Sequence, residues 1–349
     1  MIRRPPRSTQ GVSSAASDVY KRQIRYLLMS PRKTKLGILL PTRGLLLKNQ
    51  QPTSIERLIG LAELVEQSGL DGVWVGDSLV AKPRMEPLAV LSALAVRTSR
   101  VRLGTAVLLP ALRHPVLLAQ TLGTLELISG GRLVIGAGVG GAFNEDQQRE
   151  WEVAGIPSKG RGKRFDETIE IIHGLGSGEP FTFNGNHFRL DSTLMRPVPT
   201  RPGGIPFLMA THYRAHSQAQ IRRAARLGSG IISISDTPEE FAHVIKQVDD
   251  KATEFGRDPE SLEKTFYLTV NMNPNLEEAE ADAVEWLTGY YGSNIWGTRW
   301  GPFGGHERVT ERLSEYVTAG ADTVVVRFAS FEPERQLEIF LEKVAPAFA

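Results

Sequence analysis

The sequence contains no cysteine and no long apolar run. Without cysteine, disulfides, cysteine nucleophiles and thiolate metal sites are excluded, and the chain suits a reducing, cytoplasmic compartment. The longest apolar stretches fall short of the roughly 18 residues that a membrane-spanning helix needs, so we expect no membrane association. Hydrophobic residues make up 41% of the 349 positions and charged residues 23%, as in an ordinary globular protein.

The amino-terminal end of the sequence is nearly without acidic residues. Residues 1–35 hold six arginines, three lysines and one aspartate, a net charge of +8, whereas the formal net charge of the whole chain is +2. The remainder therefore carries −6. A body with that charge lacks the basic surface that nucleic acids require, so we expect no nucleic-acid partner.

Residues 1–28 show neither an apolar period nor helix caps. We expect a disordered tail outside the fold. The segment resembles translated sequencing-adaptor read-through, which predicts that it is non-native and that the natural start lies near Met29. The alternative is a transit peptide, because such peptides are also rich in arginine and serine and poor in acidic residues.

From Lys35 onward, short apolar runs alternate with helical patterns, which predicts one (β/α)8 TIM barrel over residues 35–345. A doubly wound open sheet is the alternative. Eight strands are predicted, at 36–40, 72–75, 101–108, 133–137, 207–210, 230–234, 265–270 and 323–328. Helices are predicted between and after them, at about 53–67, 85–98, 115–128, 164–174, 217–227, 238–255, 276–290, 307–319 and 333–345.

Local signals support several of these helices. Leu58, Leu61, Ala62 and Val65 share one helical face, which predicts that this face packs on the sheet. Capping boxes are expected at the start of three helices, since Thr53, Ser217 and Thr237 each precede Glu or Gln by three positions.

Two insertions interrupt the alternation, one after strand 4 (142–205) and one between strands 7 and 8 (290–305). The first contains a predicted hairpin over 181–190 with Asn184-Gly185 as its turn. Insertions of this length inside a barrel are usually functional loops.

Gly136, Gly138 and Gly141 match the G-x-G-x-x-G pattern of dinucleotide-binding turns. The pattern follows the fourth predicted strand rather than the first, and the acidic residue expected about twenty positions later is missing. We therefore interpret the glycines, together with Gly140, as backbone that a flat ligand can approach closely.

Several motifs, in this order and spacing, resemble the luciferase-like flavin oxidoreductases, and the match covers nearly all of 35–345. They are Trp74-Val-Gly-Asp77, Glu86-Pro87, Arg102-Leu-Gly-Thr-Ala106, Arg113-His-Pro115, Ser129-Gly-Gly-Arg132, Asn144-Glu145 and the ending Ala319–Arg327. The resemblance implies a (β/α)8 barrel that binds FMN or the 8-hydroxy-5-deazaflavin coenzyme F420 at the carboxyl ends of its strands. It also implies oxygenation with reduced flavin, or hydride transfer to or from the deazaflavin.

The resemblance places the third strand behind the flavin ring, with a bulge and often a non-proline cis peptide at Ala106–Val107. Thr105 belongs to the same floor. An ordinary buried strand is the alternative. Asp77 at the end of the second strand, Gly138 and Gly140 are expected to line the coenzyme, as is Asn144, which could equally be a plain helix start.

The coenzyme phosphate is expected near the helix start after the fifth strand, where backbone N–H groups favour anions. Thr211, His212, Arg214 and Ser217 are suitable ligands there, and a solvated helix cap is the alternative.

At two positions the chain departs from its relatives. Ser78 stands where many members have a histidine that acts as acid or base, and serine does not titrate near neutral pH. Gly141 stands where sugar-phosphate-oxidising members have a glutamate, which argues against that activity. His114, in the loop after the third strand, is therefore the candidate catalytic residue, with a loop-stabilising role as its alternative.

The second insertion holds a dense aromatic cluster made of Tyr290, Tyr291, Trp296, Trp300 and Phe303. It could form a lid that excludes water or a subunit contact.

We expect an oxidoreductase of the monooxygenase type that acts on a small organic substrate, as a homodimer. An F420-dependent hydride transferase and a non-catalytic flavin-binding barrel remain as alternatives. No metal site is expected, because the histidines show no ligand spacing.

Overall fold

The short buried strands pair edge to edge and close into a parallel barrel. The computed structural model describes residues 34–349 except 50 and 294–296, so the expected tail at 1–28 lies outside the described residues. The barrel strands follow the order β1 (Lys35–Leu39), β2 (Gly72–Val75), β3 (Arg102–Leu108), β4 (Leu133–Ala137), β7 (Phe207–Ala210), β8 (Gly230–Ile234), β9 (Glu263–Met272) and β11 (Thr323–Phe328). Pairing of β11 with β1 closes the ring, which confirms the predicted (β/α)8 barrel.

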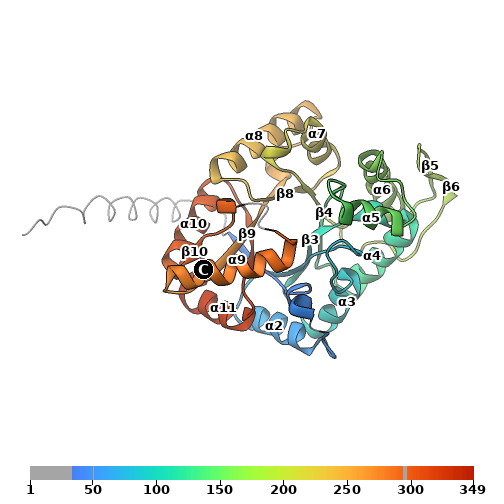
Figure 1. The fold of residues 1–349 in the computed structure, drawn as a ribbon. Coiled ribbons are helices and arrows are strands. Elements are labelled where there is room, and N and C mark those ends of the chain that lie inside the picture. Colours follow the sequence, from blue (N-terminus) through green and yellow to red (C-terminus); the bar gives the residue numbers. More distant parts are fainter. Residues whose placement is uncertain (1–33, 50, 294–296) are drawn as a thin grey trace, which may run out of the picture. The chain divides into compact units, whose positions relative to one another are not determined.

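Helices surround the strands, as Figure 1 shows. They are α2 (Glu56–Gln67), α3 (Pro87–Arg97), α4 (Pro115–Ser129), α6 (Arg161–Gly176), α7 (Gln218–Leu227), α8 (Pro238–Glu254), α10 (His306–Thr318) and α11 (Pro333–Ile339). Short 3₁₀ and π segments lie at η1 (Gly44–Asn49), η2 (Pro110–Leu112), η3 (Tyr213–Ala215), η4 (Pro259–Ser261), η5 (Gly297–Arg299), η6 (Phe340–Val344) and η7 (Ala345–Phe348).

The predicted face of α2 is confirmed, since all four of its apolar residues are buried. Of the three predicted capping boxes, the one at Thr237 is complete. Ser217 accepts a hydrogen bond from the Gln220 amide, but the Gln220 side chain accepts from the His212 amide instead of returning to the cap. The box at Thr53 is wrong because α2 begins only at Glu56, whose amide donates to Ser54 Oγ.

Both insertions are present and carry extra elements. Between β4 and β7 lie α5 (Glu145–Val153), of which the sequence indicated only an alternative helix start at Asn144, and a hairpin of β5 (Phe181–Asn184) and β6 (Arg189–Thr193). The hairpin loop spans 185–188 rather than a two-residue turn, and the Gly185 amide donates to the Phe188 carbonyl across it. Between β9 and β11 lie α9 (Leu276–Tyr291) and the short β10 (Phe303–Gly304).

One side chain from each strand fills the interior of the barrel. The largest belongs to Trp74, and glycines on both neighbouring strands leave space for its indole. A Cβ atom on Gly104 would lie 2.2 Å from the Trp74 ring, and one on Gly37 would lie 2.4 Å from it. The interior set is Leu39, Trp74, Ala106, Val134, Leu208, Ile232, Tyr267 and Val325. A second, larger core lies between strands and helices.

Within the described part of the chain, no helix has the length and apolar character needed to cross a bilayer. The same residues contain no group of three or more His, Asp or Glu side chains arranged to hold a metal ion.

Candidate functional site

A cavity of about 160 Å³ opens where the barrel strands end at their carboxyl side. Its apolar lining comes from β3, β7 and β8, through Ala106, Val107, Ala210, Ile232 and Ile234. The Ala106–Val107 peptide bond is cis, at the position that the resemblance implied. This end of a parallel barrel is where enzymes of this architecture hold their ligands.

His212 and Ser233 form one polar wall of the cavity. Ser233 Oγ donates to Asp236 Oδ2 over 2.6 Å, and His212 Nδ1 lies 3.5 Å from the same hydroxyl oxygen. Because the Ser233 proton is already engaged, its oxygen is free to accept from Nδ1–H, which would leave Nε2 as the proton acceptor. Burial lowers the pKa of His212, so the imidazole is neutral at neutral pH.

Three tyrosines and one arginine also line the cavity and form its second wall: Tyr267, Tyr290, Tyr291 and Arg84. Arg84 Nη1 donates to Tyr290 Oη over 3.0 Å, and Arg84 Nε donates to the Lys82 carbonyl. The aromatic rings and the guanidinium give this wall a flat, cationic character.

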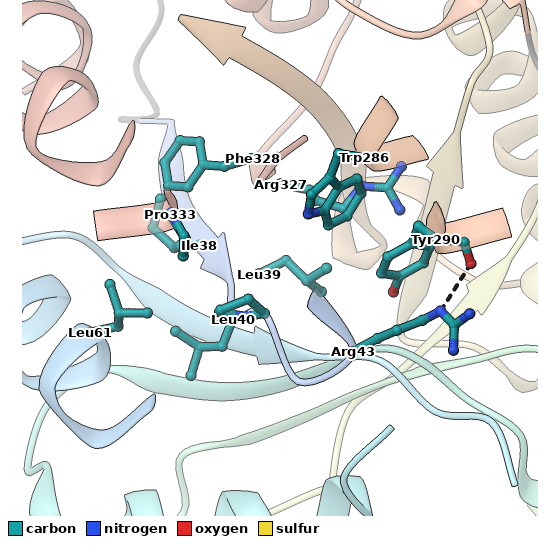
Figure 2. A pocket seen from close by; sticks show the side chains of 11 residues that line it. Ile38, Leu39, Leu40, Arg43, Leu61, Trp286, Tyr290, Arg327, Phe328 and Pro333 are labelled. Atoms are coloured by element: carbon teal, nitrogen blue, oxygen red, sulfur yellow. Dashed lines mark hydrogen bonds between the residues drawn. The ribbon is translucent and has the colours of Figure 1, made fainter. Parts of the chain in front are cut away.

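Behind Tyr290 lie two further arginines, which Figure 2 shows on either side of its ring. Arg43 Nε donates to the Tyr290 carbonyl over 2.9 Å. The buried Arg327 donates to Tyr291 Oη and Thr269 Oγ1, and its guanidinium lies 4.5–5.5 Å from five aromatic ring centres. Burial raises the pKa of the Tyr290 hydroxyl, but Arg84, Arg327 and Arg43 together lower it by more.

Asp77 is committed to contacts within the protein. Its carboxylate accepts two hydrogen bonds from Arg113, at 2.6 and 3.1 Å, and a third from the Leu109 amide. Arg113 also donates to Glu86, which caps α3. Three of the motifs that carry the resemblance therefore meet in one ion-pair cluster, which fixes the loop after β3.

The loop after β2 is held from α5. Ser78 Oγ donates to Glu150 over 2.6 Å, and the amides of Leu79, Val80 and Ala81 donate to the same carboxylate oxygen. Ser78 thus anchors this loop.

The predicted glycine loop packs on protein side chains. A Cβ on Gly138 would lie 2.9 Å from the Val107 side chain, and one on Gly140 would lie 2.9 Å from Trp151. Gly138 therefore supports the floor residue Val107 from behind. Thr105 is fully buried and donates to the Gly136 carbonyl over 2.8 Å.

The remaining predicted ligands are largely engaged in local bonds. The side chain of the exposed Asn144 caps α5, as the helix-start interpretation expected. Thr211 is buried and its hydroxyl donates to the Met209 carbonyl. Ser217 caps α7. Of the residues expected to hold a phosphate, His212 alone lines the cavity.

His114 does not line the cavity. It precedes α4 as an exposed residue without a side-chain cap bond, and its ring packs edge-on against Phe188 of the hairpin, 5.8 Å between ring centres.

Most of the aromatic cluster is gathered near Arg327. Tyr290 and Trp300 are buried within this chain, and Tyr291 stacks on Trp300. Phe303 lies in β10, which pairs with β9. Trp296 lies outside the described residues.

Sequence reasoning missed the arginines of this site and the Ser233–Asp236 pair. Arg43, Arg84 and Arg327 lie far apart in the sequence, and each follows or ends a different strand. Their shared position at the carboxyl side of parallel strands is the one signal that could have grouped them.

Comparisons with known proteins agree with this architecture. Residues 34–300 match the family model of the luciferase-like monooxygenases. An uncharacterized protein of Mycobacterium tuberculosis is 36% identical over 176 residues, which cover 50% of this chain and 57% of that protein. The chain therefore aligns with little more than half the length of that relative.

Two further matches extend over most of the chain. An F420-dependent glucose-6-phosphate dehydrogenase of Nocardia farcinica is 27% identical over 321 residues, covering 83% of this chain and 93% of that enzyme. The crystal structure of the monooxygenase RslO1 from Streptomyces bottropensis superposes with a TM-score of 0.76 at 26% identity, covering 90% of this chain and 100% of that one. The family match, the closed barrel and the cavity at its carboxyl end agree, and the chain belongs to the luciferase-like monooxygenase family.

Proposed function

We propose that the protein is a flavin-type oxidoreductase that acts on a small organic substrate in the cavity at the carboxyl ends of β3, β7 and β8. The carrying observation is that cavity itself, with an apolar floor at Ala106–Val107 and His212 on its wall, in a chain of this family. We place FMN or F420 as the coenzyme.

The residues present fit a planar ring. The floor carries small and aliphatic side chains, Tyr267 and Tyr290 offer aromatic faces, and His212 and Ser233 offer polar groups at the edge. Such a lining, mainly apolar with a few placed polar groups, is typical of cofactor sites. When bound, the coenzyme would supply hydride-transfer or oxygen-activating chemistry.

The chain's own residues take separate roles in this proposal. Ala106, Val107 and His212 contact the coenzyme or substrate, and the neutral His212 accepts a proton at Nε2 while Ser233 and Asp236 hold its tautomer. Gly138 and Asp77 keep the floor in place. The tyrosine wall, with Trp300 stacked behind it, excludes water as the predicted lid would.

Two alternatives are favoured by specific observations. The long alignment with the Nocardia enzyme favours F420-dependent hydride transfer. The departures at Ser78 and Gly141 favour a barrel that binds a flavin without turnover.

Separate titrations of the purified protein with FMN and with F420, followed by absorbance and fluorescence, test these possibilities. The proposal predicts micromolar binding of one coenzyme and oxidation of its reduced form with a substrate from a panel of small molecules. Binding of neither would refute both enzyme proposals. Binding without turnover would favour the non-catalytic barrel.

We further propose a cytoplasmic homodimer, on the basis of the missing cysteine and the family resemblance. Light scattering during gel filtration measures the mass of the assembly.

A further inference from the structure

We propose that the Arg84 end of the cavity binds the anionic oxygen of a small aromatic acid, so that substrates carry a carboxylate or an equivalent charged oxygen. This inference rests on the proposed function and names the substrate class of the same site.

The first argument is charge. Arg43, Arg84 and Arg327 all lie 5.2–5.4 Å from the centre of the Tyr290 ring. In the part of the chain that the structure describes, none of the three forms an ion pair with a carboxylate. Their hydrogen-bond and stacking partners are carbonyls, hydroxyls and ring faces. Arg327 is buried, and Arg43 and Arg84 are half-buried. Even an ionised Tyr290 would leave two positive charges of this partly desolvated cluster uncompensated, which favours an incoming anion.

The second argument is position. Arg84 belongs to the wall of the cavity, whereas Arg43 and Arg327 lie behind Tyr290 around a separate, much smaller cavity (Figure 2). Arg84 Nη1 lies over Gly76, the residue that follows β2, where a Cβ atom would approach it to 2.2 Å. The missing side chain at Gly76 therefore makes room for the guanidinium beside the floor.

The third argument is shape. Apart from Arg84, His212 and Ser233, the cavity lining is apolar or aromatic, with Val107, Ile232 and Tyr267 among its members. A ligand that fits both the apolar and aromatic lining and the Arg84 guanidinium has a flat apolar body and one negatively charged end. Guanidinium and carboxylate form strong, directional hydrogen bonds, which gives Arg84 the role of a specificity-determining residue.

Binding of benzoate and of its neutral counterpart benzamide, measured by calorimetry on the full chain, tests this proposal. We expect benzoate to bind at least about tenfold more tightly than benzamide, as loss of a charge-assisted hydrogen bond implies. The preference should disappear in Arg84→Met. It should also weaken in Gly76→Ala, which keeps the arginine but displaces its guanidinium.

Arg189→Met serves as the matched control, because Arg189 is exposed on the β5–β6 hairpin. It should keep the full preference, and far-UV circular dichroism shows whether each variant is folded. Equal binding of the two probes, no binding of either, or a preference that survives in folded Arg84→Met would overturn the proposal.

Repeating the titration with FMN or F420 already bound separates the two sources of an anion. Benzoate binding that persists assigns the site to the substrate, whereas benzoate that competes with the coenzyme assigns Arg84 to the coenzyme and overturns the substrate assignment. If neither coenzyme binds while the benzoate preference remains, the proposed function fails and the anion site stands.

Discussion

Among single residues, His212 has the surroundings that proton transfer requires. It lies at the ends of β7 and β8, burial lowers its pKa, and Ser233 bridges it to Asp236. We predict that His212→Asn lowers turnover by about 10²-fold or more, the usual contribution of a positioned acid or base, while coenzyme affinity changes little. Steady-state kinetics and a coenzyme titration measure the two effects separately.

The comparison variant is His114→Ala. Because His114 is exposed and packs against Phe188, we expect turnover close to that of the unmodified protein. A large loss in His114→Ala together with an active His212→Asn would return the catalytic role to His114.

Gly104 controls the packing of the barrel interior. An added methyl group at this position meets the Trp74 ring at 2.2 Å, and the surrounding strands leave the indole little space to move. We predict that Gly104→Ala destabilises the fold by about 1–3 kcal/mol, as overpacking of a core does. Urea unfolding measures this change.

Gly60→Ala is the control for that experiment. Gly60 is exposed inside α2 and nothing lies near its missing Cβ. Alanine should stabilise the helix by up to about 1 kcal/mol. Equal effects at Gly60 and Gly104 would contradict the packing argument.

Among the elements, α5 holds a loop of the barrel in place, although its own sequence is mostly polar and exposed. Its residue Glu150 holds the loop after β2 through Ser78 and three backbone amides. We predict that Glu150→Gln speeds hydrogen exchange at Leu79–Ala81 by about tenfold or more, because the uncharged amide oxygen accepts the same four hydrogen bonds more weakly than the carboxylate does. Glu152→Gln, on an exposed face of the same helix, should leave exchange unchanged.

The barrel elements could be predicted closely because each strand is a compact apolar run between helices with one apolar face. For α5 the sequence indicated a possible start at Asn144 but not the helix itself. Trp151 is the one large apolar residue that α5 buries, and a polar sequence of nine residues has no helical period to detect. The hairpin was located, but Asn184-Gly185 did not form its turn, because the structure places Phe188 in the loop and buries it.

The candidate site was predicted in part. Its floor at Ala106–Val107 followed from the family resemblance. His212 was expected after the fifth strand, but as a ligand of the coenzyme phosphate and not as an acid or base. The cationic wall depends on contacts between Arg43, Arg84 and Tyr290, which lie up to 247 positions apart. No local pattern records such contacts, since they arise only when the barrel closes.

At the scale of the whole molecule, an ion pair ties the amino-terminal ends of the barrel strands together. Arg102 at the start of β3 donates two hydrogen bonds of 2.8 Å to Glu263 at the start of β9, and Thr323 of β11 donates to the same carboxylate. Because β3 and β9 are not neighbours in the sheet, the pair joins strands that no backbone ladder connects.

This pair makes a defined contribution to the pH dependence of stability. Burial raises the pKa of Glu263, but Arg102, Lys35 and Thr323 lower it by more. The pKa of Glu263 in the folded protein is therefore below its ordinary value. A carboxyl group whose pKa is lowered by folding stabilises the folded state at every pH above its pKa in the unfolded chain. This stabilisation is lost as the pH falls through the pKa of the group in the folded protein. The stabilisation is therefore complete at pH 7 and declines below the ordinary glutamate pKa of 4.5.

We predict that Glu263→Gln lowers the free energy of unfolding at pH 7 by about 3 kcal/mol, because it leaves Arg102 without its partner. The difference between the two proteins should shrink as the pH falls below 4.5, since the glutamate itself then becomes neutral. Urea unfolding across this range tests both points, with the exposed Glu338→Gln as the control. If the two proteins differ in unfolding free energy by the same amount at pH 3 and at pH 7, the Glu263 carboxylate charge does not stabilise the contact between the amino-terminal ends of β3 and β9.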